Sequence, residues 1–224
     1  MIEERKYEDE ADPADFAPDF DKQPEPYGRA IPELLQCFDR LAPGSHIIDI
    51  AGGYGRYAIP LAEAGHEVTI VDIHEASLAE ARKRAQKLNS RTGAIHTVNS
   101  DVMRQSLANT QQYDAALCAG FIHHLNNQGV RDLFSYMTDS VKPGGLVVLE
   151  FSTNKQRRYP DGTPILVGGA PEHNCTYEEG MELLASLYPP DSFKDVEYSV
   201  TKLKERQIDF WYDADMISVG GIKI

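Results

Sequence analysis

The sequence has few cysteines, and their number and spacing argue against both a disulfide framework and a cysteine metal site. Cys37, Cys118 and Cys175 are far apart in a chain of 224 residues. A disulfide framework needs an even set of cysteines, and zinc-binding cysteines come in closely spaced pairs. His173 lies two residues before Cys175, but two ligands without partners do not make a metal site. We therefore predict reduced thiols, a cytoplasmic location and no bound metal.

Long hydrophobic runs are also missing. No apolar stretch approaches the roughly 20 residues that a helix needs to cross a bilayer. The first 21 residues are acidic and lack the basic-then-apolar order of a secretory signal. We therefore expect neither a membrane span nor a secreted protein.

Basic residues are scarce. Lys and Arg number 22 against 35 Asp and Glu, and the formal net charge is −13. Proteins that bind nucleic acid present a basic face to the phosphate backbone. The nearest candidate is Lys155-Gln156-Arg157-Arg158, a short run that we interpret as a solvated loop. The charge therefore argues against a nucleic-acid substrate and favours a small-molecule substrate.

The composition is otherwise ordinary for one globular domain. Hydrophobic residues make up 42% and charged residues 25% of the chain, which suffices for a single buried core. Residues 1–29 hold ten acids, four bases and several prolines. We expect this acidic segment to be partly mobile and residues 30–224 to form the domain.

From Ser45 onward, strand-like and helix-like patterns alternate, which predicts parallel strands joined by right-handed crossovers. The predicted fold is an α/β doubly wound seven-stranded sheet, mostly parallel, with an antiparallel C-terminal strand and helices on both faces. A polar stretch with three prolines, 152–174, predicts a loop or lid. The expected strands are 46–50, 67–71, 94–98, 113–119, 146–151, 195–204 and 216–224, and the expected helices are 31–41, 54–64, 75–88, 130–141 and 177–187.

A glycine-rich turn follows the first predicted strand, in His46-Ile47-Ile48-Asp49-Ile50-Ala51-Gly52-Gly53-Tyr54-Gly55-Arg56. Such a turn at the carboxyl end of a strand and the start of a helix forms a cradle for an anion or cofactor. The run from Gly53 to Ala58 also fits the G-x-G-x-x-G/A pattern of dinucleotide binders, and Asp72 follows the second strand. Asp49 argues against a dinucleotide, since its carboxylate would repel a pyrophosphate.

Taken together, these motifs resemble the class I (Rossmann-like) S-adenosylmethionine-dependent methyltransferases over about residues 30–152. The glycine turn matches their D-x-G-x-G-x-G motif, with Ala51 in place of the first glycine. The other matching segments are the acid Asp72, the pair Asp101-Val102, the segment 119–125 after the fourth strand and the turn Lys142-Pro143-Gly144-Gly145.

The resemblance implies S-adenosyl-L-methionine as cofactor. It implies that backbone N–H groups of the turn bind the cofactor carboxylate, that Asp49 supports the turn or meets the ammonium, and that Asp72 accepts the ribose hydroxyls. Asp72 and Asp101 have an alternative interpretation as helix caps. The implied cofactor-binding residues are Asp49, Ala51, Gly52, Gly53, Gly55, Asp72, Ile73, Ser100, Asp101, Val102, Ala119 and Gly120, with Tyr27 and Arg29 closing over the site from the N-terminal segment or forming a surface turn.

The implied reaction is an in-line transfer of a methyl group to a small molecule, in which the protein aligns the acceptor and excludes water. His123 or His124 is the candidate base, with a purely structural role as the alternative. Glu150 is a further candidate base, or a loop hydrogen-bond partner. Trp211 is interpreted as sheet-edge packing or a homodimer contact. The alternatives are a protein- or RNA-modifying methyltransferase, a nicotinamide-dependent oxidoreductase, and a non-catalytic cofactor-binding module.

Overall fold

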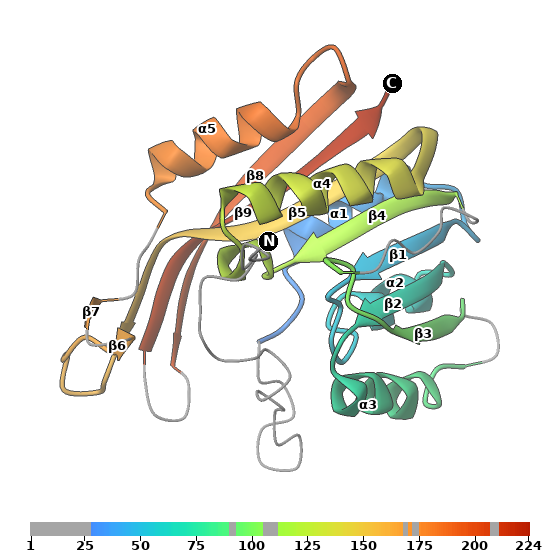
Figure 1. Ribbon diagram of the computed structural model, residues 1–224. Helices are drawn as coiled ribbons and strands as arrows, with labels where there is room; N and C mark the ends of the chain where they lie inside the picture. The colour runs from blue at the N-terminus through green and yellow to red at the C-terminus, as the bar shows by residue number, and fades with distance from the viewer. Residues whose placement is uncertain (1–27, 90–92, 105–111, 168–169, 172–174, 207–210) are drawn as a thin grey trace.

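The computed structural model describes residues 28–89, 93–104, 112–167, 170–171, 175–206 and 211–224. Its main feature is a seven-stranded sheet with the strand order β3-β2-β1-β4-β5-β9-β8, which confirms the predicted fold class (Figure 1). The first five strands of this order pair in parallel, and β9 pairs antiparallel with both β5 and β8. The strands are β1 His46–Ile50, β2 Glu67–Asp72, β3 Ile95–Asn99, β4 Tyr113–Ala119, β5 Val141–Arg158, β8 Phe193–Arg206 and β9 Trp211–Lys223.

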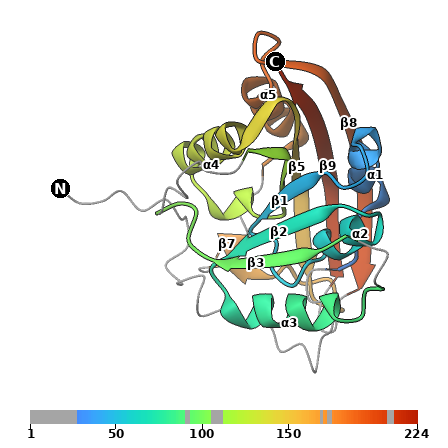
Figure 2. The same ribbon diagram turned by 90° about the vertical axis from the view of Figure 1, so that its right-hand side faces the viewer.

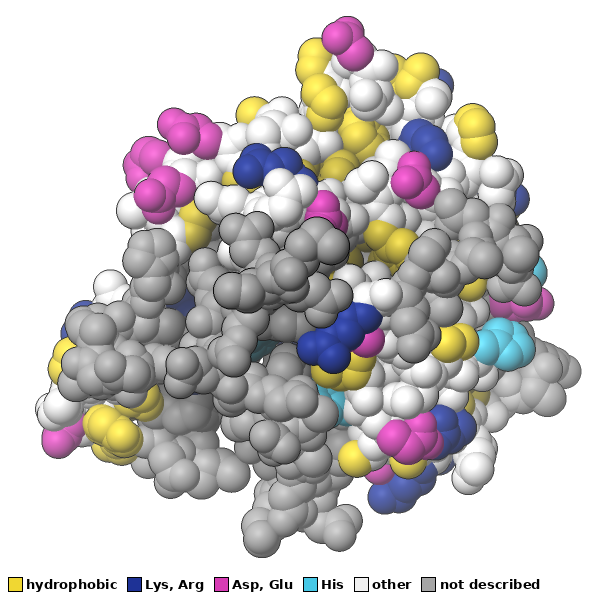
Figure 3. Space-filling view, in the orientation of Figure 1, with side chains coloured by type: hydrophobic (Ala, Val, Ile, Leu, Met, Phe, Trp, Pro, Cys, Tyr) yellow, Lys and Arg dark blue, Asp and Glu magenta, His cyan; other side chains and the backbone are white. Residues whose placement is uncertain are grey.

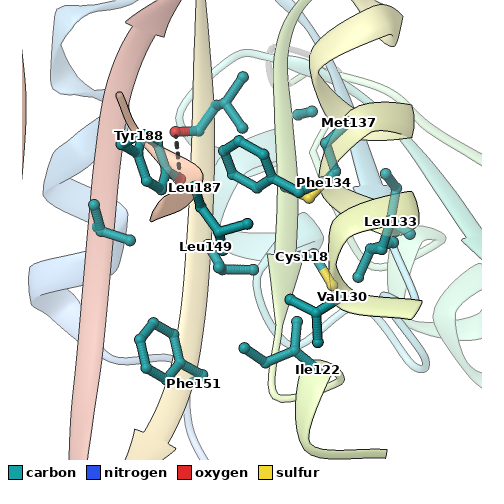
Figure 4. Packing of buried hydrophobic residues seen from close by; sticks show 14 of the residues in the cluster. Cys118, Ile122, Val130, Leu133, Phe134, Met137, Leu149, Phe151, Leu187 and Tyr188 are labelled. Carbon is teal, nitrogen blue, oxygen red and sulfur yellow. Dashed lines mark hydrogen bonds between the residues drawn. The ribbon is translucent and has the colours of Figure 1, made fainter. Parts of the chain in front are cut away.

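Helices cover both faces of the sheet (Figures 1 and 2). One core cluster packs α4 and α5 on alternate side chains of β1, β4, β5 and β9, and the other packs α1, α2 and α3 on the opposite face. Figure 4 shows the first cluster, in which Phe134 and Met137 of α4 face Leu149 and Tyr188. The helices are α1 Pro32–Gln36, η2 Cys37–Arg40, α2 Ala58–Glu63, α3 Glu75–Ala85, η3 Ile122–His124, α4 Asn127–Ser140 and α5 Tyr177–Leu187.

Several predicted boundaries were wrong. The helix expected at 54–64 begins only at Ala58, because the residues before it form the glycine turn. The helix expected at 31–41 is one α-helical turn followed by a 3₁₀ turn.

The largest correction concerns the loop expected at 152–174. Its first seven residues belong to β5, because β9 pairs with them from Ser152↔Met216 to Arg158↔Trp211. The same segment also contains the short strands β6 Leu166–Val167 and β7 Ala170–Pro171, which pair with each other. β5, β8 and β9 therefore extend well beyond β1–β4, toward the lower left of Figure 1.

The predicted turn at 142–145 interrupts the pairing of β4 with β5 without ending the strand. Tyr113 pairs with Val141 and Ala115 pairs with Leu146, so four residues of β5 lie opposite a single residue of β4. Gly144 has φ 78° at this irregularity, a conformation that glycine adopts without steric cost.

The strand order reverses next to β1, which has β2 on one side and β4 on the other. The chain leaves β1 toward one edge of the sheet and leaves β4 toward the other edge, and in open α/β sheets ligands bind at the carboxyl ends of the strands at such a point. The glycine turn follows β1 at this point.

Candidate functional site

The glycine turn is built from residues in the left-handed region of the backbone. Ala51 has φ 55°, Gly53 has φ 54° and Gly55 has φ 84°. The Ala51 N–H donates to Val71 O at 2.8 Å, and the Gly55 N–H donates to Gly52 O at 2.9 Å. Ala51, the one departure from the glycine motif, thus has a conformation that costs an alanine about 1–2 kcal/mol relative to glycine.

Asp49 lies directly beneath the turn and is buried, with 1% of its surface exposed. A Cβ added to Gly52 would lie 2.6 Å from Asp49 Cγ, so this approach requires glycine. Within the described part of the chain, Asp49 Oδ1 is a buried oxygen without a hydrogen-bond partner. Burial, reinforced by Asp72 and Glu150 and opposed by Arg56, raises the pKa of Asp49 from 3.8 to about 7. Among the described residues, the site therefore holds a buried acceptor, Asp49 Oδ1, that lacks a donor.

Asp72 connects the turn to the next helix. Its Oδ2 accepts from the Gly53 N–H at 2.9 Å, and its Oδ1 accepts from the His74 N–H at 2.8 Å. Burial raises the pKa of Asp72, and these backbone donors oppose the shift. His74 directly precedes α3, whose N-cap has no side-chain cap hydrogen bond, so Asp72 holds the residue before the helix and its interpretation as a helix cap stays a prediction. Each carboxylate oxygen has a further lone pair, so the ribose-binding role stays a prediction.

The ends of β2 and β3 lie side by side and bring Ser100 and Asp101 next to Asp72. The register pairs Asp72 with Asn99, and the Ser100 N–H donates to Asp72 O at 3.0 Å. Asp101 Oδ1 accepts from the Met103 N–H at 2.9 Å, and Oδ2 lies 3.3 Å from Arg104 Nε. Asp101 thus stabilises a local turn, while its adenine-binding role is untested.

Most of the predicted cofactor residues lie along the carboxyl edge and are partly accessible. A cofactor bound there would contact residues that are neither sealed in the core nor fully solvated. The half-buried residues of the predicted set are Ala51, Gly52, Gly53, Ile73, Asp101, Val102, Ala119 and Gly120, whereas Asp49, Gly55, Asp72 and Ser100 are buried.

The two histidines follow β4 on the short helix η3. Their ring centroids are 4.1 Å apart, and Gly120, with φ 70°, joins β4 to this segment. His123 keeps an exposed surface, yet the protein packed around its ring, followed by His124, Lys155, Arg157 and Arg56, lowers its pKa well below 6.5. His123 is therefore neutral near pH 7 and able to accept a proton.

A buried network around Glu150 was missed at the sequence level. Glu150 has no exposed surface, and its Oε1 lies 2.9 Å from Arg56 Nη2. The Tyr57 hydroxyl donates to Glu150 Oε2 and accepts from the Ile31 N–H at 3.2 Å. Both carboxylate oxygens of Glu150 interact with internal donors, which favours its alternative interpretation as a hydrogen-bond partner, while its role as a base stays a prediction. Arg56 and Glu150 are 94 positions apart in the sequence, and no local sequence pattern links them. The one sequence feature that could have indicated this ion pair is the place of Arg56 directly after the glycine motif.

The beginning of the described chain lies against the glycine turn. The Tyr54 hydroxyl donates to Gly28 O at 3.1 Å. Arg29 is exposed, and Tyr27 lies outside the described residues. The predicted closure by Tyr27 and Arg29 is thus not tested, although the chain enters the domain beside the site.

The described residues were also compared with what a metal site, a membrane span and a basic surface each require. Among the described residues, no group of three or more His, Cys, Asp or Glu side chains could hold a metal ion. The described part of the chain contains no helix long and apolar enough to span a membrane. On the face in Figure 3, described Lys and Arg side chains form small separate groups interspersed with Asp and Glu.

Comparison with known sequences identifies relatives of the central part of the chain. Residues 47–145 match the model of a family described as a methyltransferase domain. The chain is 25% identical over 136 residues to a ubiquinone biosynthesis O-methyltransferase of Rickettsia typhi, covering 59% of this chain and 52% of the relative. It is 33% identical over 119 residues to a ubiquinone/menaquinone biosynthesis C-methyltransferase of Paracoccus denitrificans, covering 51% and 46%. The chain thus spans about half the length of these curated relatives.

Solved structures share the fold at low sequence identity. An S-adenosylmethionine-dependent methyltransferase from Methanosarcina mazei matches with a TM-score of 0.64 and 19% identity, covering 87% of this chain and 98% of that one. An N-methyltransferase from Bradyrhizobium japonicum, solved with S-adenosylhomocysteine, matches with a TM-score of 0.57 and 16% identity, covering 86% and 84%.

Proposed function

We propose that this chain, a member of the class I (Rossmann-like) S-adenosylmethionine-dependent methyltransferases, transfers a methyl group from S-adenosyl-L-methionine to a small-molecule acceptor. The observation that carries the proposal is the buried Asp49 beneath the glycine turn, whose Oδ1 lacks a donor within the described residues. An ammonium group such as that of the cofactor's amino-acid end would supply the missing donor and favour the ionised carboxylate.

The rest of the proposed cofactor site follows the carboxyl edge. Backbone groups of Ala51, Gly52, Gly53 and Gly55 form the cradle for the amino-acid end, and Ala119 and Gly120 flank it. Asp72 is the proposed acceptor for the ribose hydroxyls, because the lone pairs not used by the Gly53 and His74 N–H groups are available. Ser100, Asp101, Ile73 and Val102 are the proposed contacts of the adenine end, and Tyr27 and Arg29 are proposed to close over the cofactor.

The cofactor supplies an already activated methyl group on a sulfonium, so the protein's own task is alignment, exclusion of water and proton handling. We propose that His123 accepts the proton when the acceptor is a hydroxyl or a protonated amine. Its lowered pKa keeps the imidazole neutral near pH 7, and the ring of His124 lies beside it.

A thermal-shift series tests the cofactor. S-adenosylhomocysteine at about 100 times its dissociation constant should stabilise the protein by about 3 kcal/mol, which corresponds to roughly 5–10 °C. Asp72→Ala should weaken this binding at least tenfold, whereas Asp139→Ala on the exposed surface of α4 should not change it. Stabilisation by NAD in place of S-adenosylhomocysteine would overturn the proposal in favour of an oxidoreductase.

The alternatives have less support from the site. A pyrophosphate beside the buried Asp49 would face a carboxyl group rather than a cation, which argues against a nicotinamide cofactor. On the face shown in Figure 3, the described Lys and Arg side chains form separate small groups, which does not favour an RNA substrate. A non-catalytic module would bind S-adenosylhomocysteine and turn over no acceptor.

The proposal includes a cytoplasmic location and a possible homodimer. The three cysteines are free thiols, as a reducing compartment requires. Trp211 is 37% exposed at the start of β9 and is the candidate contact for a second copy. Light scattering at micromolar concentration would distinguish a dimer from a monomer, and Trp211→Ser should shift a dimer that uses this contact toward the monomer.

A further inference from the structure

The side chain of Arg56 crosses the end of β4. Arg56 follows the glycine turn after β1, and its Nη2 lies 2.9 Å from Oε1 of Glu150 on β5. β4 lies between β1 and β5 in the sheet (Figure 1), and neighbouring strands are about 4.8 Å apart. The ion pair therefore joins the turn after β1 to a strand that is two positions away in the sheet.

Gly120, the first residue after β4, lies against this guanidinium. A Cβ added to Gly120 would lie 3.4 Å from Arg56 Nη2. The Gly120 N–H donates to Glu150 O at 3.0 Å, and Ala119 pairs with Glu150 in the register. Glu150 thus holds the segment after β4 through its backbone and the glycine turn through its side chain.

The register places Asp49 and Glu150 on the same face of the sheet. Asp49 pairs with Leu117 of β4. Glu150 pairs with Ala119 of the same strand. Leu117 and Ala119 are two residues apart, so their side chains and those of their partners point to one face. Arg56 therefore reaches Glu150 on the face that carries the buried Asp49.

Burial makes this ion pair sensitive to the loss of either partner. The Glu150 side chain has no exposed surface, and the Arg56 side chain is 16% exposed. Arg56 Cζ lies 4.7 Å from the centroid of the Tyr57 ring, and the Tyr57 hydroxyl donates to the same carboxylate. Removing one partner of a buried pair leaves the other charge without compensation, so the residues around it would rearrange.

We propose that Arg56 and Glu150 are positioning residues of the cofactor site, and that their ion pair holds the glycine turn and the segment after β4 at a fixed separation. This inference rests on the proposed methyltransferase function. The turn is the proposed cradle for the amino-acid end of the cofactor, and the segment after β4 carries Gly120 and His123. The ion pair acts through the groups that it holds in place.

Binding of S-adenosylhomocysteine to variants of the pair tests this role. Arg56→Gln and Glu150→Gln should each weaken binding at pH 7 by about tenfold or more, because a displaced turn misaligns its N–H groups. Arg56→Lys keeps a cation and should retain most of the affinity. Melting curves establish that each variant is folded at the temperature of the binding measurement.

An apolar replacement of both partners separates binding from stability. Arg56→Met/Glu150→Leu leaves no uncompensated charge, so it should lose less stability than either single variant and stay folded if they do not. It should nevertheless bind S-adenosylhomocysteine as weakly as the single variants, because the contact across β4 is gone.

The matched control is an ion pair at the other end of the same two strands. Lys142 Nζ lies 2.5 Å from Asp114 Oδ1. Lys142 is near the start of β5 and Asp114 near the start of β4, away from the carboxyl edge. Lys142→Gln should change the affinity for S-adenosylhomocysteine by no more than about twofold, because distant sites act independently.

The pH profile of binding gives a second readout. Burial raises the pKa of Asp49, and Arg56 opposes this shift. Asp72 and Glu150 reinforce it. Because the ionised Asp49 carboxylate favours an ammonium, the affinity should level off at a higher pH in Arg56→Gln and at a lower pH in Glu150→Gln than in the wild type. A loss of stability alone would not shift the two profiles in opposite directions.

The outcomes separate the two proposals. Failure of S-adenosylhomocysteine to bind to the wild type would contradict the proposed function, whatever the ion pair does. Binding to the wild type with equal affinity in the single variants and in the apolar double variant would overturn the positioning role alone. An equal loss of affinity in Lys142→Gln would also overturn it. Profiles that do not shift in opposite directions would mean that the loss reflects a general loosening of the protein, which would likewise overturn it.

Discussion

Replacing Asp49 by asparagine should stabilise the free protein, and increasingly so as the pH rises. Burial raises the pKa of Asp49 from 3.8 in the unfolded chain to about 7 in the folded protein. The folded state therefore binds a proton that the unfolded state has released over this range, so wild-type stability falls as the pH increases through it. An asparagine side chain at this position would have no proton to lose, and its contribution would be independent of pH.

The magnitude follows from the shift. A difference of about three pKa units corresponds to about 4 kcal/mol between the two ends of the range. Between pH 5 and pH 8, the stability of Asp49→Asn relative to the wild type should increase by about 2–3 kcal/mol. Asp72, whose pKa is also raised, titrates in both proteins and so largely cancels from the difference.

Urea denaturation at pH 5, 6, 7 and 8 measures this difference. Asp139→Asn, an exposed carboxyl on α4, is the matched control and should show a flat difference. A difference between Asp49→Asn and the wild type that does not change with pH would refute the reasoning, because it would mean that Asp49 is already ionised in the folded protein.

The same proton should be released when the cofactor binds, if an ammonium pairs with the Asp49 carboxylate. The affinity of the wild type for S-adenosylhomocysteine should rise with pH up to about 7, by at most tenfold per pH unit. Calorimetry at pH 6 in two buffers of different ionisation enthalpy would detect the released proton. Asp49→Asn should bind more weakly and release none, and equal proton release in the variant would exclude Asp49 as its source.

Three further substitutions have expected outcomes. Ala51→Gly should raise the free energy of unfolding by about 0.5–1 kcal/mol, because Ala51 has φ 55° and the relief of strain outweighs the greater freedom of glycine in the unfolded chain. An unchanged midpoint of urea denaturation would contradict this prediction. Gly52→Ala should destabilise the protein by roughly 1–3 kcal/mol and weaken S-adenosylhomocysteine binding, since the new Cβ would lie 2.6 Å from Asp49 Cγ. If the variant keeps the melting temperature and the S-adenosylhomocysteine affinity of the wild type, the turn can shift away from Asp49. Tyr57→Phe should cost about 1–3 kcal/mol, because it removes the hydroxyl that donates to the buried Glu150 and accepts from the Ile31 N–H; urea denaturation measures the loss, and a neutral result would mean that another donor replaces the hydroxyl.

The parallel part of the fold could be predicted from the sequence because its strands are apolar on both faces. The run Ala115-Ala116-Leu117-Cys118 is fully buried, as a central parallel strand requires. The glycine turn was equally visible, because its positive φ angles and the approach of Gly52 to Asp49 need residues that the sequence shows directly.

The length of β5 could not be predicted, because it depends on a partner elsewhere in the chain. The residues from Ser152 to Arg158 are polar or charged and are strand only because β9 pairs with them. The Glu150 network was hidden for the same reason, since Arg56, Tyr57 and Ile31 meet it only after folding. The residue pattern of a segment indicates only its own preference for strand or helix. Whether the segment after Phe151 forms a strand is decided by its pairing with a distant segment of the chain.

Two tyrosines of the glycine turn determine where the preceding chain is anchored. Tyr54 holds the carbonyl of Gly28, and Tyr57 holds the N–H of Ile31. Whatever conformation residues 1–27 have, one end of that segment is fixed beside the cofactor edge. A tether attached at such a point keeps its residues at an effective local concentration on the order of millimolar. The ten acids of the first 29 residues belong to a segment that is attached at this edge.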